Sequence, residues 1–362
     1  MKNIVKQSIL NVKPYQPGKP IDEVEREWGL TDVCKLASNE NPYPPSAKVI
    51  RAIQRELKGL NRYPDGNCFY LRKALAKHLG VEKDQIVFGN GSDEIIVLAV
   101  RAFAGDGDEV ITAHPTFLIY EIATRAAGAN IRLVPLKDFR YDLRAMRKAV
   151  TDRTKIVFIA NPNNPTGTYV TQSELEDFLR GLSPKIIVFL DEAYYEFVQE
   201  KDYPKSLKLL ERYPNVIFTR TFSKIYSLAG LRVGYGIASQ EMVELLNRIR
   251  EPFNVNTVAQ AAALAALDDR RYYQRIQKEI EGEKKRLYQN FQKMPVTFVK
   301  SAANFILMDV KTDSRQVSQE LLRQGVIVRD MASWGMEGFI RVTVGTPKEN
   351  NKLIKALKNV LK

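Results

Sequence analysis

The chain has 362 residues, of which 44% are hydrophobic and 27% are charged, and this length predicts either two domains or one large domain with a smaller lobe. Only two cysteines occur, Cys34 and Cys68, without a C-x-x-C spacing or a nearby histidine. They indicate two unpaired intracellular thiols, and we expect no metal site.

The net charge of +13 is compatible with nucleic acid, an acidic membrane surface or anionic small molecules as partners. The basic residues are scattered among acids rather than grouped with aromatic residues, so we expect no nucleic-acid partner. The longest run of small apolar residues, 258–267, is too short to span a bilayer, and no targeting signal is recognisable. We therefore expect a soluble, cytoplasmic protein with no membrane partner.

Residues 1–31 contain several prolines and glycines and predict an extended arm followed by a short helix. From residue 85 onward, apolar strands alternate with amphipathic helices. This alternation predicts an α/β domain with a mostly parallel sheet covered on both faces. The predicted strands are 86–88, 109–112, 131–135, 155–160, 186–190, 216–219 and 233–238, and the helices include 92–103, 142–150 and 171–180.

The pattern changes after residue 267 to a long, charged, helix-favouring stretch, 268–293, followed by short strands and two further helices, 314–324 and 348–361. These elements predict a smaller α+β domain. The expected organisation is an arm or part of the small lobe over 1–31, a large domain over 32–267 and a small C-terminal domain over 268–362.

Polar motifs follow several of the predicted strands. Lys224 ends the run Thr-Phe-Ser-Lys, and Arg232 lies eight positions later between glycines, which suits a carbonyl cofactor that carries a phosphate. The segment 161–167, Asn-Pro-Asn-Asn-Pro-Thr-Gly, follows one strand, and Asp191 closes another. Ligands of parallel sheets gather at the carboxyl ends of the strands, so these motifs together predict a pyridoxal phosphate site.

The chemistry of that cofactor matches these residue types. A lysine that forms an imine must lose a proton from a group whose pKa is ordinarily about 10.4. The positive charge of Arg232 would favour the neutral amine, and the same guanidinium could bind a phosphate. A buried Asp191 beside a pyridine nitrogen would hold its proton there. Tyr194 and Asn164 are suited to donate hydrogen bonds to a phenolate oxygen.

The segment 89–93, Gly-Asn-Gly-Ser-Asp, follows a strand and opens a helix, which makes it a candidate phosphate seat. It is neither a dinucleotide fingerprint nor a P-loop, because the third glycine and the Gly-Lys-Ser/Thr are missing. Taken singly, each motif is explained equally well as a helix cap, a turn or a surface lysine. Their joint occurrence in this order favours one site.

The motifs 163–167, Asp191 with Tyr194, Ser223-Lys224 and Arg232 resemble those of the fold type I aminotransferases. Longer stretches, at 36–42, 62–66, 88–94, 221–224 and 341–345, resemble the histidinol-phosphate aminotransferases, and the likeness spans nearly the whole chain. This resemblance implies a large pyridoxal-phosphate-binding domain with a mostly parallel sheet flanked by helices, and a smaller α+β domain.

The resemblance also implies roles for individual residues. Lys224 carries the cofactor, Asp191 pairs with the ring nitrogen, Tyr194 and Asn164 contact the ring hydroxyl, and Phe117 stacks on the ring at a position that is often tyrosine. The implied phosphate contacts and their turn are Gly91, Ser92, Asp93, Thr221, Ser223 and Arg232. Tyr63 would reach the phosphate from the second subunit of a homodimer with shared sites.

On the substrate side, the resemblance assigns Arg341 to the donor carboxylate and Arg329 to the anionic end of the substrate. A guanidinium binds carboxylate or phosphate in the same bidentate way, so one pocket can serve glutamate and a phosphate ester. Tyr15 and Asn39 are further candidates, although packing of the arm explains Tyr15 equally well.

The reaction implied is amino transfer between L-histidinol phosphate and 2-oxoglutarate, giving imidazole-acetol phosphate and L-glutamate in histidine biosynthesis, with Lys224 as anchor and general acid/base. The sequence leaves open a broad-range aromatic aminotransferase and a threonine-phosphate decarboxylase of cobalamin biosynthesis. A regulator that senses the cofactor would need a separate DNA-binding domain, which about thirty N-terminal residues cannot supply. A simple basic binding protein is the least favoured reading.

Overall fold

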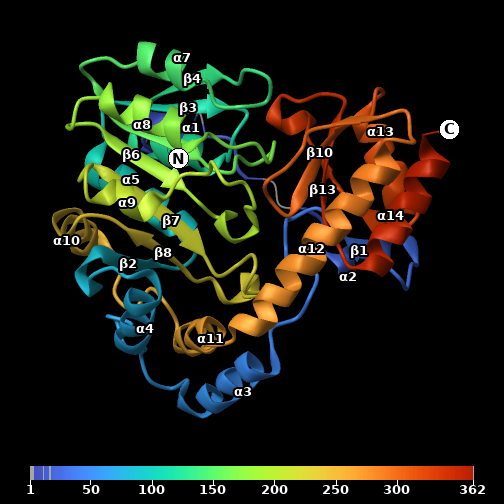
Figure 1. The fold of residues 1–362 in the computed structure, drawn as a ribbon, viewed down its shortest axis with the longest axis horizontal. Helices are drawn as coiled ribbons and strands as arrows, with labels where there is room; N and C mark the ends of the chain where they lie inside the picture. Colours follow the sequence, from blue (N-terminus) through green and yellow to red (C-terminus); the bar gives the residue numbers. More distant parts are fainter. Residues whose placement is uncertain (1–3, 11, 16–17, 362) are drawn as a thin grey trace.

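The computed structural model describes residues 4–10, 12–15 and 18–361. Parts of the predicted arm, residues 1–3, 11, 16 and 17, lie outside the described residues, as does residue 362. The chain forms one large sheet with flanking helices and a second, smaller sheet beside it (Figure 1).

The large sheet has seven strands in the order β2-β8-β7-β6-β5-β3-β4. All neighbours run parallel except β8, which is antiparallel to both β7 and β2. The expected mostly parallel sheet is therefore confirmed. The strands are β2 (Ile86–Gly89), β3 (Glu109–His114), β4 (Asn130–Pro135), β5 (Thr154–Ala160), β6 (Ile187–Asp191), β7 (Val216–Thr221) and β8 (Gly234–Ile237).

The central strands are buried on both faces: β6 is apolar up to its last residue, and β7 begins with three apolar residues and ends with three buried polar ones. Every residue of β7 is buried, and so are all residues of β6 after Ile187, as expected for a sheet covered on both faces. The flanking helices are α5 (Ser92–Phe103), α6 (Ile119–Ala127), α7 (Leu143–Lys148), α8 (Gln172–Arg180), α9 (Ser206–Leu210) and α10 (Gln240–Ile249). Helix α5 packs across β2, β8 and β7 and so fixes its N-terminus near the end of β2.

Three helices cluster at one side of this sheet, where α11 (Thr257–Leu267) packs against α3 (Ala47–Glu56) and α4 (Phe69–Leu79). Neither α3 nor α11 was predicted from the sequence. Helix α11 is almost uniformly apolar, so it shows no helical periodicity, and it is stabilised by the neighbours that bury its alanines.

The second sheet is antiparallel, with the order β12-β13-β10-β9. Its strands are β9 (Thr297–Phe298), β10 (Phe305–Asp309), β12 (Arg329–Asp330) and β13 (Phe339–Thr343), and its helices are α13 (Ser314–Arg323) and α14 (Pro347–Val360). The long helix α12 (Arg270–Phe291) runs from beside α11 to this sheet and joins the two regions (Figure 1).

The N-terminal residues return to the smaller sheet region. Strand β1 (Cys34–Lys35) pairs in parallel with β11 (Val326–Ile327), and α2 (Ile21–Trp28) buries Val24 against Ala37 and Ile327. The segment predicted to begin the large domain at residue 32 therefore starts beside the C-terminal elements. The domain boundaries stay a prediction.

The remaining elements are short: α1 (Gln7–Leu10), and the 3-10 turns at Leu57–Gly59, Lys83–Gln85, Tyr195–Phe197, Ala229–Leu231 and Ala332–Trp334. The short strands β11 and β12 follow one another in the chain but belong to different sheets. Among the described residues, no helix combines the length and the apolar character needed to cross a membrane.

Candidate active site

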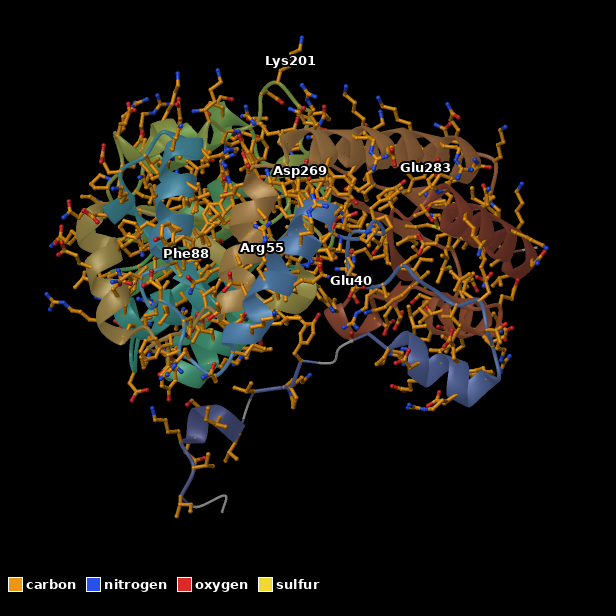
Figure 2. The ribbon with its side chains drawn as sticks, turned by 90° about the horizontal axis from the view of Figure 1, so that it is seen from below. Glu40, Arg55, Phe88, Lys201, Asp269 and Glu283 are labelled. Carbon is orange, nitrogen blue, oxygen red and sulfur yellow. The ribbon has the colours of Figure 1, made fainter. Side chains whose placement is uncertain are left out.

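A cavity of about 410 Å³ lies between the carboxyl ends of the large sheet and the small sheet. Glu40, one of its lining residues, lies where the two regions of the chain meet (Figure 2). Fourteen of the predicted site residues line this cavity: Tyr15, Asn39, Ser92, Asp93, Phe117, Asn164, Asp191, Tyr194, Thr221, Ser223, Lys224, Arg232, Arg329 and Arg341. The structure therefore brings together motifs that are more than 300 residues apart.

Lys224 lies just after β7, and no hydrogen bond or ion pair to its ammonium group occurs among the described residues. Its Nζ lies 5.6 Å from the centre of the Tyr194 ring. Burial, with a smaller effect from Arg341, lowers the pKa of Lys224 to about 8. A larger fraction of this amine is therefore uncharged at neutral pH than in a free lysine.

Asp191 is the last residue of β6 and is only 6% exposed. Its Oδ2 accepts a 2.7 Å hydrogen bond from the Tyr120 hydroxyl, and its Oδ1 accepts a 3.1 Å bond from the Ala193 amide. Burial raises the pKa of Asp191 despite these two bonds, because no cation among the described residues pairs with it. The carboxylate is thus suited to a cationic ligand atom.

The turn after β5 is held by a network of buried side chains. The Asn163 amide nitrogen donates to Thr166 Oγ1 at 3.0 Å, and its oxygen accepts from Thr116 at 2.8 Å. Gly167 has φ +73°, and a Cβ there would lie 2.1 Å from Ser301 Oγ. These contacts hold the turn so that the next side chain, Asn164, lines the cavity.

Arg341 on β13 is 5% exposed and reaches the cavity from the small sheet. It donates to Asn164 Oδ1, and to the Ala37 carbonyl at 2.7 Å, while its Nε has no hydrogen-bond partner. Burial lowers the pKa of Arg341 to about 10. A buried guanidinium without a carboxylate partner among the described residues is suited to bind an anionic ligand.

Asn39 connects the two sheets at the edge of the cavity. Its backbone amide donates to Thr343 Oγ1 at 2.9 Å, and its side-chain amide donates to the Tyr194 hydroxyl at 2.9 Å. Asn39 therefore orients Tyr194, and the tyrosine proton remains free to be donated to a ligand.

The candidate phosphate seat is the N-terminus of α5. Arg232 Nη2 donates to Asp93 Oδ1 at 2.8 Å. Gly91 has φ +88°, and an added Cβ would lie 2.1 Å from Asp93 Oδ1 and 2.3 Å from Arg232 Nη2, so only glycine fits. Asp93 thus holds Arg232 beside the free amide groups of the first helical turn.

Two aromatic positions complete the cavity wall. Phe117 packs edge-on against Tyr120 at 5.7 Å. The Arg329 guanidinium lies 5.9 Å from the centre of the Tyr15 ring, so both explanations offered for Tyr15, arm packing and lining the site, describe its position.

Tyr63 does not line the cavity of its own chain. It is 82% exposed and stacks on Phe253 with the ring centres 4.7 Å apart. This position is compatible with the expected contribution to a second subunit, which stays a prediction.

Sequence reasoning missed Tyr120, which is completely buried and stacked on Phe158. It is the side chain that donates to Asp191. The available signal was its position three residues after Phe117, which puts both on the same face of the chain as it enters α6.

Residues 31–357 match the family model described as aminotransferase class I and II. The chain belongs to this family, whose members use pyridoxal phosphate.

Two relatives are described as histidinol-phosphate aminotransferases. That from Moorella thermoacetica is 48% identical over 98% of this chain and 92% of its own, and that from Brevibacillus brevis is 48% identical over 98% of both chains. The solved histidinol-phosphate aminotransferase of Sinorhizobium meliloti, in complex with pyridoxal-5'-phosphate, aligns with a TM-score of 0.90 and 28% identity. It covers 99% of this chain and 97% of that chain.

The residues in the cavity fit this cofactor. Asp191 is a buried carboxylate without a cation, and a protonated pyridine nitrogen would supply one. The helix terminus at Gly91 and the nearby Arg232 suit a phosphate, and Lys224 has a lowered pKa, which suits imine formation.

Proposed function

We propose that this aminotransferase transfers an amino group between L-histidinol phosphate and 2-oxoglutarate, giving imidazole-acetol phosphate and L-glutamate in histidine biosynthesis. The observation that carries the proposal is the division of charge in one cavity. An uncompensated carboxylate, Asp191, lies on the side of the large sheet, and two guanidinium groups, Arg341 and Arg329, lie on the side of the small sheet. The names of the relatives support the same substrate.

The cofactor would be held by residues from five segments, 91–93, 117, 164, 191–194 and 221–232. Lys224 would bind it covalently, and Asp191 would contact the ring nitrogen. Tyr194 and Asn164 would contact the ring oxygen, and Phe117 would cover one face of the ring. The phosphate would be bound by Gly91, Ser92, Thr221, Ser223 and Arg232, with Asp93 orienting Arg232. When bound, the cofactor supplies an aldehyde carbon and an electron-withdrawing ring.

Side chains of the protein would bind the substrates and transfer the proton. Arg341 would bind the carboxylate of glutamate, and Arg341 with Arg329 would bind the phosphate of histidinol phosphate, because a guanidinium accepts either anion. Lys224 would move a proton at the substrate Cα as general base and acid. Its pKa of about 8 lies close enough to neutrality for both directions of that transfer.

The test is a panel of amines added to the protein loaded with pyridoxal phosphate, followed by its visible absorption spectrum. L-histidinol phosphate, L-phenylalanine and L-threonine phosphate separate the three candidate activities. We expect the largest kcat/KM for histidinol phosphate, with 2-oxoglutarate restoring the starting spectrum. Faster conversion of phenylalanine would favour the aromatic aminotransferase, and release of carbon dioxide from threonine phosphate would favour the decarboxylase.

We further propose a cytoplasmic homodimer in which Tyr63 of each chain completes the site of the other. The support is the exposure of Tyr63 and of the neighbouring apolar side chains Leu57, Leu60, Phe69 and Tyr70. The test is to mix an inactive Lys224→Ala chain with an inactive Tyr63→Ala chain. Shared sites predict that mixing restores part of the activity, whereas independent sites predict no recovery.

A further inference from the structure

A buried ion pair lies behind the cavity. Arg220 Nε donates to Glu192 Oε2 at 3.0 Å, and Arg220 Nη2 lies 2.9 Å from the same oxygen as an ion pair; Arg220 and Glu192 are only 4% and 1% exposed. Neither residue lines the active-site cavity. The catalytic roles proposed above therefore leave the pair unexplained.

The pair joins the two strand ends from which the proposed catalytic groups project. Glu192 directly follows Asp191, and Arg220 lies on β7 one residue before Thr221. Asp191 is in register with Thr219 across the two parallel strands. Because successive side chains of a strand point to opposite faces, Arg220 lies on the other side of β7 from Thr221.

Further contacts fix the orientation of both charged groups. Glu192 Oε1 accepts from Ser206 Oγ, and the Tyr203 hydroxyl lies 3.3 Å from it. The guanidinium carbon of Arg220 lies 3.4 Å from the centre of the Tyr195 ring. The ion pair therefore has little freedom to rotate or to shorten.

Stability alone does not account for such a pair. Moving two charges out of water costs several kcal/mol per ion, and replacing a buried pair with apolar side chains of similar volume is often neutral or stabilising. A guanidinium held against one carboxylate oxygen, with the other oxygen bound by Ser206, does supply a fixed distance and angle, which apolar side chains do not.

We propose that Arg220 and Glu192 are positioning residues that set the spacing between Asp191 and the segment from Thr221 to Lys224. The pair joins the ends of β6 and β7 on the side away from the cavity. It thereby keeps the Asp191 carboxylate and the Lys224 amine at the distance at which both contact the same ligand. This inference rests on the proposed roles of Asp191 and Lys224.

The deciding variant is the double substitution Glu192→Met with Arg220→Met, which removes both charges and replaces them with apolar side chains of similar volume. We expect its melting temperature to stay within a few degrees of the wild type or to rise. We also expect kcat to fall about tenfold or more, and the dissociation constant of the cofactor-free protein for pyridoxal phosphate, measured by equilibrium dialysis, to rise about tenfold, because small misplacements of reacting groups are costly.

Two further variants complete the design. Arg220→Lys keeps the charge and loses the planar fork, so it should lower kcat severalfold and shift the pH titration of the visible band of the loaded enzyme. Glu109→Gln removes a buried carboxylate from the amino end of β3, away from the strand ends that form the cavity. Glu109 is 4% exposed and paired with Arg132 and Arg153, and its replacement should leave kcat and cofactor affinity unchanged.

A double variant with wild-type kcat and wild-type cofactor affinity would overturn the inference. If the double variant does not fold, Arg220→Lys decides, since a lower melting temperature with unchanged kcat and pH titration would mean a purely structural role. Failure of the wild type itself to bind pyridoxal phosphate would instead refute the proposed function.

Discussion

The large sheet buries one carboxylate at the amino end of a strand and another at the carboxyl end of a strand, but their surroundings differ. Glu109, at the start of β3, accepts hydrogen bonds from Arg153 at 2.6 Å, Arg132 at 3.2 Å and Thr151 at 2.8 Å. Burial would raise the pKa of Glu109, but these bonds outweigh it and lower the pKa. Asp191, at the end of β6, has only a hydroxyl and an amide, and its pKa is raised.

The presence or absence of counter-ions distinguishes a structural carboxylate, Glu109, from a carboxylate of the candidate site, Asp191. A buried charge with its counter-ions in place is tolerated by the folded chain, whereas one without them destabilises it until a ligand supplies the missing charge. Lys224 and Arg341 resemble Asp191 in this respect, because burial lowers the pKa of each and neither forms an ion pair among the described residues. The following predictions test this contrast, beginning with the largest expected effect.

Replacing Lys224 with Ala should lower multiple-turnover transamination by roughly 10³-fold or more, because both the cofactor attachment and the general acid/base are lost. The measurement is steady-state kcat with histidinol phosphate and 2-oxoglutarate. Borohydride treatment of the loaded wild type should label the peptide that contains Lys224. Transamination that persists in the variant would show that another residue carries the chemistry.

Replacing Asp191 with Asn should lower kcat roughly 10²- to 10³-fold, as loss of a preorganised electrostatic contact does. In the cofactor-free protein, by contrast, the same substitution should increase the stability of the fold. A carboxyl whose folded pKa is raised loses stabilisation as pH rises above its unfolded value, so at pH 7 Asn should raise the melting temperature. A lower melting temperature in the variant would contradict this account of Asp191.

Replacing Arg341 with Met should lower kcat/KM for glutamate about 10- to 100-fold, the effect of losing a hydrogen-bonded charge contact of about 1.5–3 kcal/mol. Arg341→Lys is the matched control, because it keeps the charge and loses the bidentate geometry. We expect it to recover only part of the loss. Equal kcat/KM values for wild type and Met variant would place the carboxylate elsewhere.

The rate at which the cofactor-free protein captures pyridoxal phosphate should depend on pH through Lys224. The neutral amine is the nucleophile, and with a pKa of about 8 its fraction falls about tenfold for each pH unit below that value. Stopped-flow absorbance between pH 6 and 9 measures this rate. A profile that keeps rising steeply beyond pH 9 would indicate an ordinary, unshifted lysine.

The smallest effect on activity is expected for Glu109, at the amino end of β3. Glu109→Gln should leave kcat unchanged and lower the free energy of unfolding at pH 7 by about 1–3 kcal/mol, because Arg132 and Arg153 lose a charged acceptor. The pKa of Glu109 is lowered by folding, so this stabilisation is present above its unfolded value and is lost as pH falls. The difference from wild type in thermal denaturation should therefore shrink in acid.

Much of the site could be predicted from the sequence because its residues follow apolar strands. Asp191 comes directly after such a run and Asn164 lies in the turn that follows another, and a parallel sheet brings strand ends together whatever the details of the fold. Arg341 and Asn39 could be assigned only through the resemblance to a family, since nothing in their local sequence connects them with Lys224.

Other features depend on tertiary contacts that a local pattern does not contain. Tyr120 and the Arg220–Glu192 pair are defined by what they meet across the sheet. The amino-acid composition of β8 does not indicate that this strand is antiparallel to its neighbours. Strand β1 forms only because β11, almost 300 residues later, lies beside it. Only Thr257 and Gln260 of helix α11 are polar, so its periodicity is hidden.

Arg341 belongs to the small sheet and Lys224 to the large one, with α12 as the long connection between them. A ligand that binds both residues adds its binding free energy to the contacts between the two sheets. In calorimetry, the regions of the ligand-free chain would be free to melt at separate temperatures, and a saturating dicarboxylate would merge their transitions into one. Substrate occupancy would then also protect the chain from proteolysis.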